Sequence, residues 1–125
     1  MRLILLPIGL LLLAGCGSVD DRSAAAASVA SSFLQAVADR DGSAACGVLA
    51  PATAEKIGED CAEGVLSEPL PAPSPVTDSQ VYGQRALVRL GNETIFLGMF
   101  PGGWRVVAAG CTPQGDRPYD CVVEG

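Results

Sequence analysis

Histidine is absent from the 125 residues, lysine occurs once, and the aromatic residues are one tryptophan, two tyrosines and three phenylalanines. Without an imidazole, the chain cannot build the Ser–His or Cys–His pair that activates a nucleophile. Gly-x-Ser-x-Gly, a lysine-bearing phosphate loop and Cys-x-x-Cys are also missing, which removes support for hydrolase, nucleotide-binding, zinc and thioredoxin-like functions. We therefore predict no catalytic residue, no metal site and no cofactor.

Long apolar runs are confined to the N-terminus, where Leu3–Leu13 follows a single arginine. A helix over Leu3–Gly15 would be about 20 Å long, which is shorter than the roughly 30 Å hydrocarbon core of a bilayer. A basic start, a short apolar run and small residues are typical of an export signal. The final Leu13-Ala14-Gly15-Cys16 resembles the lipobox of bacterial lipoproteins, in which the cysteine is diacylglycerylated and the chain is cut before it.

This resemblance implies that residues 1–15 are a signal peptide and that Cys16 carries the lipid. Residues 16–22 are then a short polar tether, and residues 23–125 form a single α+β domain. Two or more acyl chains anchor a protein stably, because each buried CH₂ group contributes ~0.8 kcal/mol. We expect the protein at the cell membrane, held on the extracytoplasmic face by acyl chains such as palmitate. The alternative is a buried or unpaired cysteine beside an ordinary signal.

The mature chain is acidic. Without Arg2, seven basic residues stand against fourteen acidic ones, a balance of −7. The acids are spread along the chain, as on a solvated surface. Because such a charge offers no footprint for nucleic acid, we expect no nucleic-acid partner. The expected partners are the membrane, through the covalent lipid, and an unknown protein or small apolar ligand.

Four cysteines remain once Cys16 is acylated: Cys46, Cys61, Cys111 and Cys121. An even number in an exported chain indicates two disulfides, for which three connectivities exist. We predict Cys46–Cys61 and Cys111–Cys121, since each pair lies within one local block of structure. A bridge that closes about 15 residues is worth about 3 kcal/mol in the chain-entropy model, a large share for a domain with few large apolar residues.

The first part of the mature chain has helical patterns. Apolar residues spaced by four predict an amphipathic helix over Ser23–Asp39. A short helix capped by Ser43 and running to Leu49 should follow, and then a third helix that starts at Pro51 and stops at Gly58.

Glu55, Glu59 and Glu63 recur every four residues. This spacing fits a metal-binding face and a solvated helix face. We favour the solvated face, because calcium sites need oxygens that converge on a turned loop.

The second part has β-rich runs separated by turn signals, with a proline-rich crossover at residues 69–75 leading into it. The runs are Gln80–Leu90, Glu93–Phe100, Gly103–Gly110 and Tyr119–Val123. The residues between Cys111 and Cys121 are expected to form a turn-rich excursion clamped at its base. Helices first and a meander second predict an α+β fold, with N-terminal helices packed on a curved antiparallel sheet and two disulfides.

Several segments resemble the cystatin-like, nuclear-transport-factor-like cone fold. They are Phe33-Leu34-Gln35-Ala36-Val37 before Asp39-Arg40-Asp41, the short helix with Cys46, and Gly103-Trp104-Arg105-Val106 on a late strand. With the lipobox, the closing Gly103–Cys111 and Tyr119-Asp120-Cys121 segments are similar to small exported bacterial lipoproteins. The resemblance implies a cone-like sheet, and the cone fold includes ketosteroid isomerases and polyketide cyclases, which use acid–base chemistry inside the cone.

Two classes of function follow as hypotheses. The first is a non-enzymatic, lipid-anchored envelope module that binds a protein, a peptide or a small apolar ligand. The alternative is a cone-fold enzyme, isomerase-like or cyclase-like, acting on a small hydrophobic substrate in a pocket near Phe33, Tyr82, Phe100 and Trp104. A purely structural envelope protein is a third hypothesis.

The enzyme hypothesis needs a hydrogen-bond donor and a base that face each other. Tyr82 and Tyr119 are candidate donors, and Asp78 and Glu93 are candidate bases, but no spacing singles out a pair. A carboxylate inside a deep pocket would favour the enzyme. Trp104 packed in the core would favour the binding module.

Overall fold

The computed structural model describes residues 18–125, and its first element is the long helix α1 (Val19–Ala38). A capping box starts this helix: Ser18 Oγ accepts from the Asp21 N–H at 3.2 Å, and the Ser18 N–H donates to the Asp21 carboxylate. This cap satisfies backbone groups that a helix start leaves unpaired. The helix therefore begins before the expected Ser23, and Val19 to Arg22 of the expected tether are helical. Residues 1–17, with Cys16, lie outside the described residues.

Three short helices follow: α2 (Gly42–Gly47), α3 (Pro51–Ile57) and α4 (Cys61–Ser67). The α2 helix is capped by Asp41, whose carboxylate accepts from the Ala44 N–H at 3.1 Å, so the predicted cap at Ser43 is wrong. The α3 helix has its proline in the first turn and ends before Gly58, as predicted. The α4 helix was not predicted, and Asp60 caps it.

The second half of the chain is one five-stranded antiparallel sheet whose spatial order follows the sequence. Its strands are β1 (Val76–Tyr82), β2 (Arg85–Leu90), β3 (Glu93–Phe100), β4 (Gly103–Gln114) and β5 (Arg117–Glu124). The prediction of one strand over Gln80–Leu90 is wrong. A turn at Gly83 and Gln84 divides that run, and β1 and β2 pair with each other.

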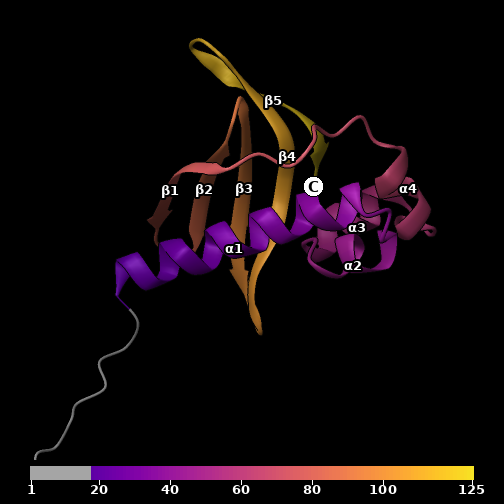
Figure 1. Cartoon of the computed structure of the whole chain (residues 1–125), viewed down its shortest axis with the longest axis horizontal. Coiled ribbons are helices and arrows are strands. Elements are labelled where there is room, and N and C mark those ends of the chain that lie inside the picture. The colour runs from indigo at the N-terminus through magenta and orange to yellow at the C-terminus, as the bar shows by residue number, and fades with distance from the viewer. Residues whose placement is uncertain (1–17) are drawn as a thin grey trace, which may run out of the picture.

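The residues between the last two cysteines form a β-hairpin. Cys111 pairs with Cys121, Thr112 with Asp120 and Gln114 with Arg117, and the ladder shifts register near its tip. The expected turn-rich excursion is therefore limited to the tip at residues 115–116. Figure 1 shows this hairpin reaching beyond the ends of the other strands.

Helix α1 crosses one face of the sheet, and the three short helices gather near the C-terminal end of α1 (Figure 1). The core lies between these two layers. It consists of apolar side chains from α1, the short helices and β2 to β4, including Ala26, Ala30, Phe33, Leu34, Val65, Val88, Ile95, Leu97, Trp104 and Val106. Strand β2 alternates between the two faces of the sheet, with Ala86, Val88 and Leu90 buried and both arginines exposed. This is the predicted α+β fold.

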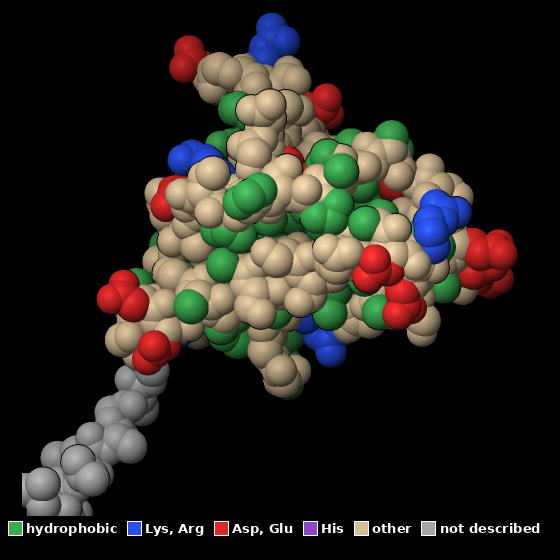
Figure 2. Space-filling model, viewed as in Figure 1, with side chains coloured by type: hydrophobic (Ala, Val, Ile, Leu, Met, Phe, Trp, Pro, Cys, Tyr) green, Lys and Arg blue, Asp and Glu red, His purple; other side chains and the backbone are tan. Residues whose placement is uncertain are grey.

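Hydrophobic side chains also gather on one face of the surface. Seen from the side of α1, they lie between that helix and the crossover, and charged groups lie nearer the edges (Figure 2). Among residues 18–125, no helix combines the length and the apolar character needed to cross a membrane.

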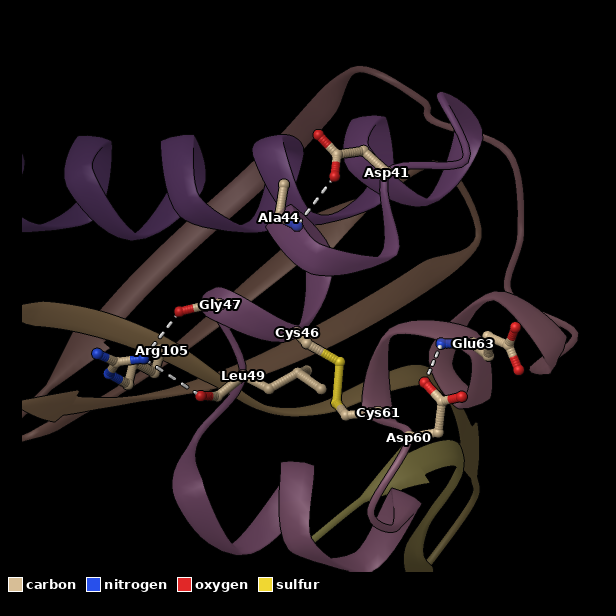
Figure 3. Close-up of a disulfide and its surroundings, with 9 residues drawn as sticks. All are labelled: Asp41, Ala44, Cys46, Gly47, Leu49, Asp60, Cys61, Glu63 and Arg105. Carbon is tan, nitrogen blue, oxygen red and sulfur yellow. Dashed lines mark hydrogen bonds between the residues drawn. A yellow bond between two sulfur atoms is a disulfide. The ribbon is translucent and has the colours of Figure 1, made fainter.

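Both predicted disulfides are confirmed. Cys46–Cys61 joins α2 to α4 (Figure 3), and Cys111–Cys121 joins β4 to β5. The segment after α2 is also tied to the sheet, because Arg105 Nη1 donates to the Gly47 carbonyl at 2.8 Å and to the Leu49 carbonyl at 3.5 Å. Helices α2 and α4 are thus joined covalently, and the end of α2 with the segment after it is held to β4 by hydrogen bonds.

Replacing Cys46 and Cys61 together by alanine should lower the free energy of unfolding. The bridge closes a separation of 15 residues, for which loop-closure entropy predicts a loss of about 3 kcal/mol. Urea unfolding measures this change, and non-reducing peptide mapping checks that Cys111–Cys121 stays intact. A loss well below about 1 kcal/mol would contradict a structural role for this bridge.

Candidate functional site

Phe33, Tyr82, Phe100 and Trp104, the residues expected to line one pocket, do not lie in a common pocket. Phe33 and Trp104 are core residues, with Trp104 only 6% exposed and the Arg22 guanidinium 5.5 Å from its ring centre. Phe100 is half-buried at the end of β3. Tyr82 is 52% exposed and lines a hollow that none of the other three reaches.

Residues 18–125 contain a pocket of about 460 Å³ beneath the proline-rich crossover, which we call the crossover pocket. Pro69, Pro71 and Ala72 form one wall, and the other walls come from the β2–β3 turn and from residues of β2 to β5. The crossover contacts the sheet on both sides of this space. A Cβ atom added to Gly91 would lie 3.0 Å from Ser74 Oγ, and one added to Gly110 would lie 3.2 Å from Leu70 Cδ2.

Glu93 is the acidic residue of the crossover pocket. It is the first residue of β3 and is only 7% exposed. Its Oε1 accepts a hydrogen bond from the Gly110 N–H at 2.9 Å. Burial raises the pKa of the Glu93 carboxyl above its ordinary value of 4.5, and the bond from Gly110 offsets part of that rise. No lysine or arginine lines the pocket.

The position of Gly110 explains how its N–H reaches Glu93. The β3–β4 ladder shifts register between Thr94 and Phe96, and Gly110 has a φ of +66° within that irregular stretch of β4. A glycine adopts this left-handed conformation readily, whereas in other residues it is strained. A side chain is also excluded by space, because a Cβ at Gly110 would lie 2.9 Å from the Val122 side chain.

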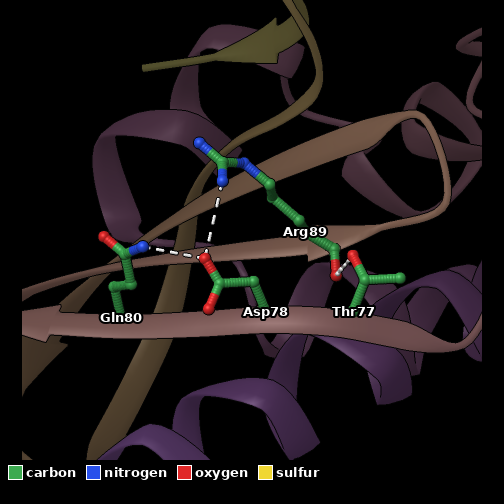
Figure 4. Close-up of polar contacts among 4 residues, drawn as sticks. All are labelled: Thr77, Asp78, Gln80 and Arg89. Carbon is green, nitrogen blue, oxygen red and sulfur yellow. Dashed lines mark hydrogen bonds and ion pairs between the residues drawn. The ribbon is translucent and has the colours of Figure 1, made fainter.

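The other candidate acid–base residues lie elsewhere. Asp78 is on β1, where its carboxylate accepts from Gln80 Nε2 at 2.8 Å and pairs with Arg89 at 3.5 Å (Figure 4). Tyr119 packs edge-on against Phe96, with ring centres 5.0 Å apart. Since neither tyrosine lines the crossover pocket, the structure separates both candidate donors from Glu93.

Tyr82 and Tyr119 line a second hollow, of about 490 Å³. Phe96 belongs to it as well, and because its neighbours Ile95 and Leu97 point into the core, Phe96 faces the side of the sheet away from α1. This hollow is an open, largely apolar surface.

The three glutamates spaced by four do not share one helix. Glu55 belongs to α3, Glu59 follows its end, and Glu63 belongs to α4. Within the described part of the chain, no three potential metal-ligating side chains form a group that could hold an ion.

Sequence reasoning named Glu93 as one of two candidate bases but could not separate it from Asp78. The available signal was its place between a hairpin turn and the apolar run of β3. Comparisons with family models, curated proteins and solved structures found nothing that matches this chain.

Replacing Gly110 by alanine should destabilise the fold more than replacing Gly115, which has a similar φ of +64° but no atom near its Cβ position. Both variants carry the cost of a left-handed backbone, about 1–2 kcal/mol. Only Gly110→Ala also displaces Val122 and the crossover. Urea unfolding of the two variants compares them directly, and equal losses would show that the close approach at Gly110 has no energetic consequence.

The buried carboxyl of Glu93 should make stability depend on pH. Because its folded pKa is raised, the folded state holds this proton more tightly than the unfolded chain does, so this contribution is complete below pH 4.5 and is lost as the pH rises through the folded pKa. Glu93→Gln keeps an acceptor for the Gly110 N–H and cannot ionise. Across this window, the free energy of unfolding of Glu93→Gln relative to that of wild type should rise with pH. A difference that is constant with pH would contradict the raised pKa of Glu93.

Proposed function

We propose that this chain is a lipoprotein of the bacterial envelope, tethered through an acylated Cys16 on the extracytoplasmic face of the cell membrane, with a folded domain that binds a ligand. The lipobox-like Leu13–Cys16 segment after a short apolar run supports the anchor. The two disulfides support export, because such bonds persist mainly in oxidising compartments.

The start of α1 shortens the proposed tether. Only Gly17 and Ser18 separate Cys16 from the first helical residue, Val19. At ~3.4 Å per residue, three steps of chain reach about 10 Å. The N-terminal end of α1 is then held against the membrane surface.

The observation that carries the binding function is the contrast between a filled core and an open pocket. In the cone fold that the sequence resembles, chemistry takes place inside the cone. In this chain, Phe33 and Trp104 fill the space between α1 and the sheet. The crossover pocket lies at the edge of that core, with mostly apolar walls and one buried carboxyl. Apolar walls with few, well-placed polar groups are the usual make-up of a ligand site.

A cone-fold enzyme, isomerase-like or cyclase-like, is the second candidate. The raised pKa of Glu93 inside a pocket favours it, since a general base needs a pKa near the working pH. This candidate requires a compound that the wild type converts and that Glu93→Gln does not. A compound that binds and is recovered unchanged supports the binding module.

Replacing Cys16 by serine should release the protein from the membrane fraction, because the thiol that carries the lipid is gone. Mass spectrometry of the wild-type protein should show an N-terminal Cys16 with added acyl chains. Ser18→Thr is the matched control, since it keeps both Cys16 and the helix cap and should remain in the membrane fraction. Soluble, unmodified protein recovered from wild-type cells would refute the anchor.

A further inference from the structure

The second oxygen of Glu93 is available to a ligand. Oε1 accepts from Gly110, and no described residue donates to Oε2. Every fully buried side-chain oxygen or nitrogen in residues 18–125 has a hydrogen-bond partner. Because Oε2 has no such partner, it is not fully buried. Since Glu93 lines the crossover pocket and is 93% buried as a residue, this oxygen is reached through the pocket.

The charge of Glu93 has no protein counter-ion in the pocket. The ion pair found in the described chain, Arg89–Asp78, is made by two other residues. A carboxylate taken out of water is costly unless it takes up a proton, or a cation and hydrogen bonds compensate it. A bound cation would supply that compensation and keep the carboxyl ionised.

The walls restrict the rest of the ligand. Most of the lining is apolar, including Pro69, Pro71, Leu90 and Val122. Besides Glu93, the polar side chains of the lining are the uncharged Ser74, Asn92 and Thr112. A space of about 460 Å³ suits a small molecule. An inorganic cation would leave these walls unused, whereas an organic cation places its apolar body against them.

We propose that the crossover pocket binds a small organic ammonium ion, with the Glu93 carboxylate as its counter-ion and the proline wall against its apolar body. This inference rests on the proposed binding function and names the ligand class of that site. The rival explanation is that Glu93 serves only to satisfy the Gly110 N–H.

Glu93→Gln separates the two explanations, because glutamine still accepts from the Gly110 N–H but carries no charge. The probe is benzylamine, which is protonated at neutral pH, and benzyl alcohol is its neutral match. Binding to the full-length protein, as isolated in detergent, is followed by the NMR shift of the Gly110 amide. Wild type should bind benzylamine saturably and Glu93→Gln about tenfold or more weakly, as expected when a charge-assisted hydrogen bond is lost.

Asp78→Asn is the control for net charge, since it removes one exposed carboxylate without touching the pocket, and it should bind benzylamine as wild type does. Equal binding of benzylamine by wild type and Glu93→Gln would overturn the proposal, as would no saturable binding to wild type. Equal binding of benzyl alcohol and benzylamine by both proteins would also overturn it, while leaving a binding domain for neutral ligands intact.

Discussion

Burial of one face of α1 against the sheet is the interaction on which the rest of the structure depends. Ala26 and Ala30 let the helix approach closely, and Phe33 fills the space between helix and strands. Trp104 completes this layer from β4. Because close-packed interiors hold few voids, a ligand site has to lie outside this core. The crossover pocket meets that condition, since it is formed beside the β2–β3 turn and no residue of α1 lines it.

The pocket exists because the crossover cannot join the sheet. Prolines at positions 69, 71, 73 and 75 have no N–H to donate, so the segment cannot form a regular strand ladder. It passes over the sheet instead (Figure 1), in contact through Leu70 and Ser74. The irregular stretch of β4 at Gly110 then turns a backbone N–H toward the space beneath, where Glu93 accepts it. Alternating prolines and one glycine thus place a carboxyl in a hollow with apolar walls.

Features fixed by local spacing could be predicted from the sequence. The two disulfides close short segments, and β2 alternates in polarity because one of its faces is buried. Features set by tertiary contacts could not. The turn at Gly83 interrupts a run whose flanks look equally β-like, and Arg22 from α1 reaches its carbonyl at 2.7 Å. Glu93 is set apart from Asp78 by the burial that the crossover and β4 provide and by the hydrogen bond from Gly110, and both depend on tertiary contacts.

The contact between Arg22 and the Gly83 carbonyl also relates the pocket to the proposed anchor. It holds the β1–β2 turn beside the first turns of α1, and this end of the domain would face the membrane if the chain is tethered at Cys16 as proposed. Strand β2 then runs from this turn to the β2–β3 turn, next to Glu93. Six residues at ~3.4 Å each separate the β1–β2 turn from the β2–β3 turn by about 20 Å. Under the proposed anchor, the pocket would therefore lie at the end of β2 away from the membrane, where a charged and hydrated ammonium ion is found.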